Sequence, residues 1–150
     1  MKRMRIVSDD SLSLESLVGI EPDSPITLEL IGFPGGSVAA MRNFIDGLSS
    51  FSDVRVHISG FLAGTGMWLL CFAKKITSDQ DVKFCCLKPQ AISFGNYAEL
   101  ENATKLLDEV DDFGSRLFLE RFGINQDYIV DKWLSVSEMK ALGFPIEVIS

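Results

Sequence analysis

The sequence predicts an α/β fold in which a mainly parallel sheet is flanked by helices. Three observations lead to this prediction. Short segments rich in β-forming residues alternate along the chain with segments whose apolar residues recur at helical spacing. The connections between these segments are short. Two connections, at residues 33–38 and 59–67, are rich in glycine and lead from a strand directly into a helix.

The composition indicates one globular domain, which we place at residues 1–150. Hydrophobic residues make up 47% of the chain and charged residues 23%, which is typical of a folded domain with a single core. The net charge of −7 argues against nucleic acid or an anionic membrane surface as the main partner. We therefore expect no nucleic acid and no membrane among the partners.

The start of the chain and the cysteines favour a cytoplasmic protein. The basic start leads into polar residues, so no signal peptide is expected, and the longest apolar run, residues 61–73, is too short to span a bilayer. The neighbours Cys85 and Cys86 would point to opposite faces of a strand, which disfavours a disulfide framework. A single histidine excludes a Cys/His zinc pattern, and we expect neither a metal nor a cofactor.

The first half of the chain contains three predicted strands, at residues 4–7, 26–31 and 54–58. Residues 13–18 are weakly helical, and prolines mark a turn at 21–25. A helix is predicted to start after Ser37, because these apolar residues recur at helical spacing: Val38, Met41, Phe44, Ile45 and Leu48.

The second half begins with a segment, residues 65–72, that is apolar on every side and predicts a helix buried in the core. A strand at 82–87, a short helix at 136–142 and a last strand at 145–149 follow from the same patterns.

The longest predicted helix covers residues 97–122. Asn96 and Glu99 resemble a capping box at its start, and Arg121 with Gly123 suits its end. Its apolar residues form a stripe wide enough to pack on the sheet and also on a second subunit: Leu100, Ala103, Leu106, Leu107, Val110, Phe113, Leu117 and Phe118.

The two glycine-rich turns are the candidate functional feature. Such strand-to-helix turns can point backbone N–H groups at one spot and form an oxyanion hole. A serine hydrolase built in this way needs a nucleophile at the second turn, where position 64 is glycine.

Four segments carry a resemblance to a known family. They are ITLELIGFPGGSV at 26–38, HISGFLAGTGMWLL at 57–70, FCCLKP at 84–89 and DKWLS at 131–135. In this order they resemble segments of the Clp protease proteolytic subunit (ClpP) family, in the crotonase-like superfamily. The resemblance covers most of the chain from residue 26 onward. It implies repeated β-β-α units, with a handle-type helix near 97–122 and an abbreviated N-terminal region at 1–25.

The resemblance also implies the positions of an active site. The family's nucleophilic serine falls on Gly64, its general-base histidine on Leu87 and its orienting aspartate on Asp131. The oxyanion-hole amides would be those of Gly36 and Thr65. Glycine has no hydroxyl and leucine accepts no proton, and losing either partner costs about 10⁶ in turnover. The resemblance therefore implies an inactive member, comparable to the ClpR subunits.

Other residues near these positions leave alternatives open. Thr65 is either a nucleophile or, as we favour, a residue at a helix start that satisfies a backbone group. His57 is either a binding residue or a packing or surface residue, and Cys85 and Cys86 are either near the cleft or simply in the core. Asp131 is either an acid or base or, as we favour, an ion-pair or capping residue.

Three functions follow as expectations. The first is a pseudoprotease with a structural, regulatory or partner-binding role. It would form a homo-oligomer, or a hetero-oligomer with a ClpP-like subunit, and its further partners would be a Clp ATPase or a peptide. The second is a crotonase-type enzyme that holds an acyl thioester on the two amides, with Asp131 as acid or base. The third is a self-assembling scaffold protein without a Clp partner.

Overall fold

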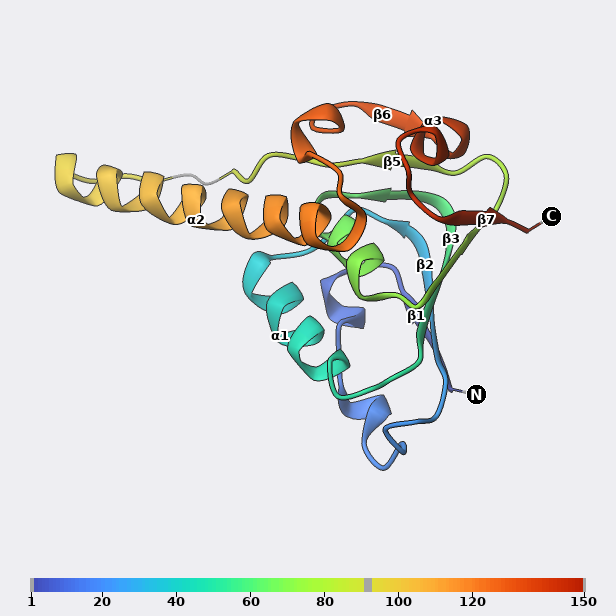
Figure 1. The fold of residues 1–150 in the computed structure, drawn as a ribbon. Coiled ribbons are helices and arrows are strands. Elements are labelled where there is room, and N and C mark those ends of the chain that lie inside the picture. The colour runs from blue at the N-terminus through green and yellow to red at the C-terminus, as the bar shows by residue number, and fades with distance from the viewer. Residues whose placement is uncertain (1, 91–92, 150) are drawn as a thin grey trace.

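Within residues 2–90 and 93–149, which the computed structural model describes, the chain is a mixed α/β fold on a seven-stranded sheet (Figure 1). The strands run in the order β1-β2-β3-β4-β7, while β5 pairs with β3 and β6 pairs with β5. All pairs are parallel except β5–β6, so the predicted mainly parallel sheet is confirmed. The strand bounds are β1 Lys2–Ile6, β2 Ile26–Phe33, β3 Val54–Ala63, β4 Lys75–Ser78, β5 Lys83–Cys85, β6 Trp133–Ser135 and β7 Ile146–Val148.

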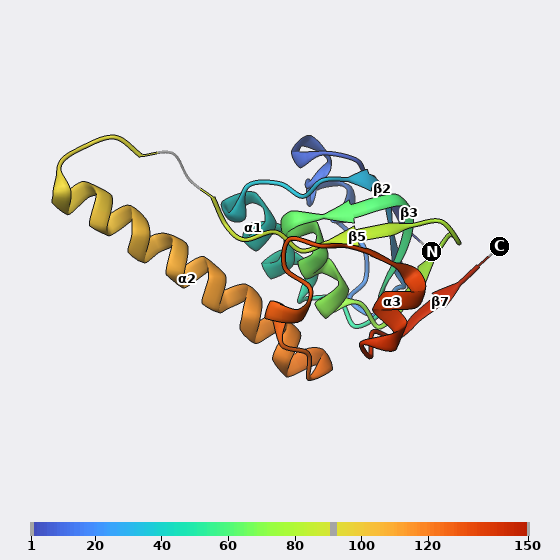
Figure 2. The same ribbon diagram turned by 90° about the horizontal axis from the view of Figure 1, so that it is seen from above.

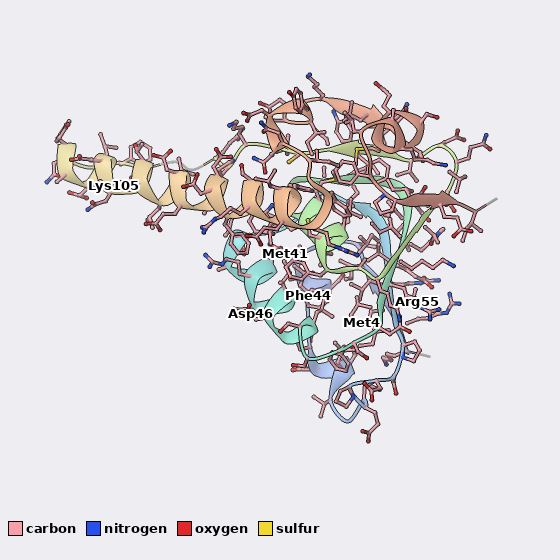
Figure 3. The ribbon with its side chains drawn as sticks, in the orientation of Figure 1. Met4, Met41, Phe44, Asp46, Arg55 and Lys105 are labelled. Carbon is pink, nitrogen blue, oxygen red and sulfur yellow. The ribbon has the colours of Figure 1, made fainter. Side chains whose placement is uncertain are left out.

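The helices that flank the sheet contact one another through a buried segment. Their bounds are α1 Val38–Leu48, the 3₁₀ helix η3 Gly64–Phe72, α2 Tyr97–Phe122 and α3 Val136–Ala141. Both α1 and α2 pack on η3. In Figure 3, Met41 and Phe44 of α1 point toward the sheet, whereas Arg55 of β3 lies on the opposite side. The main core therefore lies between the sheet and this layer of helices.

The central strand β3 carries the chain to the candidate site. It runs on to Ala63, five residues past the predicted end, because its last residues pair with β5 after its first half has paired with β4. The pairing of β2 with β3 shifts register between Ile31 and Phe33, and both strands bend there (Figure 1). The bend places the end of β2 and the end of β3 beside each other, facing α2.

The buried apolar segment is a 3₁₀ helix rather than an α-helix. Burial of residues 66–71 confirms the predicted helix in the core. Because the segment is apolar on every side, its pattern does not distinguish 3.0 from 3.6 residues per turn. Gly66 packs so closely that a Cβ there would lie 2.9 Å from side-chain atoms of both Phe33 and Leu62.

Helix α2 has the predicted bounds because both of its caps form. Asn96 and Glu99 make the reciprocal capping box, and Gly123 ends the helix in a left-handed conformation. Only the C-terminal half packs on η3, where Gly114 and Phe118 are buried. The N-terminal half extends away from the body of the molecule (Figures 1 and 2). The stripe thus contacts η3 along half of the helix, and packing on a second subunit stays a prediction.

Some elements differ from the sequence pattern. β4 and β6 are not predicted, because each is three or four residues long and is formed by pairing with distant strands. The predicted strand at 82–87 is reduced to β5, and the weakly helical stretch at 13–18 is a short 3₁₀ turn, Glu15–Leu17. Among the described residues, no helix is long and apolar enough to cross a membrane.

Candidate functional site

The two glycine-rich turns interlock backbone against backbone. Gly35 has a φ of +88°, and a Cβ at this position would lie 2.8 Å from both the carbonyl oxygen of Ala63 and the amide nitrogen of Thr65. Only glycine combines that conformation with that approach. The close contact confirms that the two turns lie together, although 27 residues lie between Gly36 and Gly64 in the sequence.

The polar groups of the turns are bonded to each other. The N–H of Gly36 donates to Thr65 Oγ1 at 2.9 Å, and the same hydroxyl donates to the Gly36 carbonyl at 2.9 Å. The Thr65 side chain therefore satisfies backbone groups, as we favoured. These groups belong to the facing turn and not to η3, the helix at whose start Thr65 lies. Ligand binding at the amides of Gly36 and Thr65 stays a prediction, and a ligand at Gly36 N–H has to displace the Thr65 hydroxyl.

The start of α1 is closed by two further side chains. The Ser37 hydroxyl accepts the N–H of Ala40 at 3.1 Å and caps the helix. The Asp9 carboxylate packs against Gly36 and accepts the N–H of Ser37 at 3.1 and 3.2 Å. A carboxylate at a helix N-terminus is electrostatically favourable. The Asp9 side chain therefore occupies the place at the start of α1 where an anionic ligand would bind.

The positions expected for a nucleophile and a base meet in space. A Cβ at Gly64 would lie 3.8 Å from Leu87 Cδ1. Asp131 lies nearby, because its N–H donates to the Cys86 carbonyl at 2.7 Å and Val130 forms a bridge with Cys86. The three positions that the family resemblance assigned to a catalytic triad, Gly64, Leu87 and Asp131, therefore lie near one another in the structure.

Two of these residues have unusual backbone conformations. Gly64 has a φ of +59°, and a Cβ there would lie 2.9 Å from the Pro34 carbonyl oxygen. Asp131 has a φ of 58°, which aspartate tolerates better than most residues. Its side chain is exposed and makes no ion pair or hydrogen bond with any described residue, so the structure shows neither of the roles we favoured for it.

A cavity of about 320 Å³ separates the two turns from α2. Its lining residues come from both turns, the segment after β5, α2 and the turn that follows α2: Pro34, Gly36, Ser37, Val38, Gly64, Thr65, Trp68, Leu87, Lys88, Pro89, Gln90, Leu107, Val110, Asp111, Gly114 and Gln126. Apolar side chains and backbone form most of the walls. The volume suits a side chain or a small ligand.

One wall of the cavity carries a hydrogen-bonded bridge. Asp111 of α2 pairs with Lys88 Nζ at 3.3 Å and accepts from Gln126 Nε2 at 3.0 Å. The carboxylate raises the pKa of the Lys88 ammonium through this hydrogen bond and its charge. The bridge closes the cavity between α2 and the segment after β5.

The far end of the cavity is formed by Trp68, Gly114 and Gln126. A Cβ at Gly114 would lie 3.0 Å from both Trp68 Nε1 and Gln126 Oε1. Trp68 is 6% exposed, as expected for a residue of the buried segment 65–72, and its ring meets Phe113 edge-on with the ring centroids 5.1 Å apart. Sequence reasoning missed this end. The one available signal was a glycine in the interior of a strong helix, which costs about 1 kcal/mol relative to alanine.

The other candidate residues lie outside the cavity lining. His57 contacts Thr77 Oγ1 at 2.8 Å and Asp79 Oδ1 at 3.0 Å across the strands, and the hydroxyl of Ser59 and the imidazole lower the pKa of Asp79. Cys85 and Cys86 are buried, and burial raises the pKa of both thiols, that of Cys86 to about 12. These cysteines are therefore core residues rather than thiolate nucleophiles.

Among the described residues, no group of three acidic, histidine or cysteine side chains is arranged to hold a metal ion. Comparison with known proteins adds no relative: no protein-family model matches the chain, and no curated protein matches it significantly.

Proposed function

We propose that this chain is a catalytically inactive member of the ClpP family that holds a peptide in its cleft without cutting it. One observation carries the proposal. The positions that correspond to the nucleophile and the base are in contact at the edge of the cavity, and they are occupied by Gly64 and Leu87. Nucleophile and base positions that meet in space but lack a hydroxyl and an imidazole are what we expect of a pseudoprotease.

The side chains that could replace the missing nucleophile and base form hydrogen bonds with other parts of the protein. The hydroxyls of Ser37 and Thr65 are bonded to backbone, and the chain's one histidine, His57, is bonded to Thr77 and Asp79 on the sheet. A hydroxyl without a base within reach is a poor nucleophile. Apolar walls with a few polar groups, in contrast, are suited to holding a peptide side chain.

An oligomeric role fits the projecting half of α2. Its N-terminal part exposes Tyr97, Leu100 and Leu106, which are 81%, 44% and 62% exposed. Exposed apolar side chains on one extended helix favour association with another subunit. We propose a cytoplasmic homo-oligomer, or a mixed oligomer with an active ClpP-like subunit, that is open to a Clp ATPase.

The inactive state is tested by peptide hydrolysis. We expect no cleavage of a fluorogenic peptide by the purified chain. We also expect none from Gly64→Ser/Leu87→His, because a Cβ at position 64 approaches the Pro34 carbonyl at 2.9 Å and strains the restored serine. Cleavage by the wild-type chain that disappears in a folded Gly36→Pro variant contradicts the proposal, because that substitution removes the backbone donor expected in the oxyanion hole. Its ring also meets the Asp9 carboxylate, so circular dichroism of the variant is measured alongside.

The partner is tested separately from the chemistry. Light scattering measures the oligomeric state of the chain alone, and a pull-down with an active ClpP-like subunit measures mixed assembly. Assembly of the chain alone, without capture of the active subunit, supports the scaffold alternative instead.

The crotonase-type alternative has weaker support. It needs both amides free and an acid or base in the cleft. The Gly36 N–H is bonded to Thr65, and Asp131 is not among the residues that line the cavity. A thermal shift with an acyl-CoA compound is the measurement that would restore this alternative.

A further inference from the structure

The α2 end of the cavity holds one hydrogen-bond donor and one acceptor that have no partner. Trp68 is 6% exposed and Gln126 is 4% exposed, and both line the cavity. Gln126 Nε2 donates to Asp111 Oδ1, which fixes the carboxamide and leaves Oε1 for the cavity. Among the residues that the structure describes, neither Trp68 Nε1 nor Gln126 Oε1 makes a hydrogen bond.

The two atoms remain accessible from the cavity. Among the described residues, Ser78 Oγ is the side-chain polar atom that is completely buried and has no hydrogen-bond partner. Trp68 Nε1 and Gln126 Oε1 also lack a partner, so they must retain some accessible surface. Polar atoms of such deeply buried residues normally have a partner. A ligand group that satisfies both atoms at once would therefore be held favourably at this end of the cavity.

Gly114 leaves the two atoms uncovered. Both atoms lie 3.0 Å from the point that a Cβ of Gly114 would occupy, so they lie close together beside α2. Glycine is unfavourable in the interior of a helix, but any side chain here would press against both atoms. A ligand group that approaches them from the cavity meets an N–H and a carbonyl oxygen side by side.

A primary carboxamide matches this pair. Its carbonyl oxygen and one of its N–H groups lie on the same edge, so the oxygen accepts from Trp68 Nε1 while the N–H donates to Gln126 Oε1. A trans peptide group presents its C=O and N–H on opposite sides and cannot reach both atoms in this way. A carboxylate would face Gln126 Oε1 without a proton to donate, and an ammonium has no acceptor for Trp68 Nε1.

The charges around the site argue against an anionic group. Lys88 is paired with Asp111 at 3.3 Å, and Asp127 and Asp131 add negative charge near it. Leu107 and Val110 supply the apolar wall along which the methylene groups of a side chain can lie.

We propose that the cavity recognises the side-chain carboxamide of a glutamine or asparagine in a bound peptide. Trp68 Nε1–H and Gln126 Oε1 bond to the C=O and N–H of the carboxamide, and Gly114 leaves both atoms uncovered by a side chain. This inference rests on the proposed function, since it assumes that the cleft holds a peptide.

Nuclear magnetic resonance of the full chain tests the inference directly. The sequence has two tryptophans, so the indole N–H region of a ¹⁵N spectrum contains two side-chain signals. Trp133 is 58% exposed, packs on Phe61 and does not line the cavity, and it serves as the internal control. The probe is N-acetylglutamine methylamide, compared with its glutamate and methionine counterparts, which match it in length.

We expect the glutamine compound to shift the Trp68 indole signal and to leave that of Trp133 unchanged. The glutamate and methionine compounds should bind at least about tenfold more weakly, because a site built to hydrogen-bond one group rejects analogues that lack it. Gln126→Met should abolish this selectivity. The matched control Gln80→Met, at an exposed position outside the cavity, should retain it.

The outcomes separate the two proposals. Equal shifts of Trp68 with all three compounds overturn the carboxamide inference and leave a peptide-holding cleft in place. No shift of Trp68 with any compound overturns both. Selectivity that persists in a folded Gln126→Met variant also overturns the inference, and the dispersion of the same spectrum reports whether the variant is folded.

Discussion

The two ends of the cavity use the same kinds of atoms in opposite ways. At the turn end, the Gly36 N–H and carbonyl are both bonded to the Thr65 hydroxyl, and Asp9 occupies the start of α1. At the α2 end, Trp68 Nε1 and Gln126 Oε1 face the cavity without a hydrogen-bond partner in the described part of the chain. The turn end looks like an active site in the sequence, whereas the α2 end is the part that is free to bind.

The difference indicates that the turn end has a structural role and the α2 end a binding role. The glycines of the turn end allow two backbones to meet, and the groups brought together satisfy one another. The glycine of the α2 end instead leaves two polar atoms uncovered by a side chain. Substitutions at the turn end should therefore affect stability, and substitutions at the α2 end should affect binding.

Gly35→Ala should have the largest effect. Its Cβ would lie 2.8 Å from two backbone atoms in a left-handed conformation, and we expect a loss of about 3 kcal/mol or more in the free energy of unfolding. Gly19→Ala is the matched control, since Gly19 has a φ of +83° and no atom within 4 Å of its Cβ position. This control should lose about 1 kcal/mol. Equal losses in urea denaturation would show that the turns do not interlock.

Thr65→Val should cost about 2 kcal/mol, because it leaves the Gly36 N–H and carbonyl without their partner. Thr104→Val is the control, since its hydroxyl donates to the Leu100 carbonyl on the exposed part of α2. The control should change stability by about 0.5 kcal/mol or less. If Thr65→Val is equally mild, the Gly36 amide is open to ligands after all.

The pH dependence of stability reports whether the chain directly before Leu87 is buried. Burial raises the pKa of Cys86, directly before Leu87, from 9.0 to about 12. Above pH 9 the thiol ionises in the unfolded chain but not in the folded one. The free energy of unfolding should therefore fall by about 1.4 kcal/mol per pH unit for this group between pH 9 and 12.

The control for this titration is Cys86→Ala, whose free energy of unfolding should fall less steeply over the same range. Cys71, whose pKa is also raised to about 12, remains as a second contribution in both proteins. Identical slopes for the wild type and the variant would mean that Cys86 is open to solvent.

Gly114→Ala should have the smallest effect on stability and a large effect on binding. The gain in helix propensity of about 1 kcal/mol offsets the tight approach of its Cβ to Trp68 and Gln126 at 3.0 Å. We expect a net change within about 1 kcal/mol in denaturation and loss of the Trp68 response to the glutamine compound. A stable variant that keeps this response would make the space at Gly114 irrelevant.

Much of the fold could be predicted because its signals are local. Apolar spacing after Ser37 and the capping box at Asn96 gave the starts of α1 and α2 to the residue, and glycine and proline marked the turns. The short strands β4 and β6 could not be predicted, since their few residues become strands only by pairing with distant segments. The 3₁₀ geometry of η3 could not be predicted, because a segment that is apolar on every side has no periodicity that distinguishes a 3₁₀ helix from an α-helix.

The candidate site was predictable only in part. Turn spacing and family resemblance selected Gly64 and Leu87, which lie together, but could not show that Thr65 already occupies the Gly36 amide. The pairing of Trp68 with Gln126 depends on how α2 crosses η3, and nothing in the local sequence reports that crossing.

The most direct test is a crystal structure of the chain with N-acetylglutamine methylamide bound. We predict that the carboxamide lies beside Gly114, with its oxygen on Trp68 Nε1 and its N–H on Gln126 Oε1, while Thr65 keeps its bonds to Gly36. A ligand carbonyl bound to the Gly36 N–H, with the Thr65 hydroxyl displaced, would contradict this account.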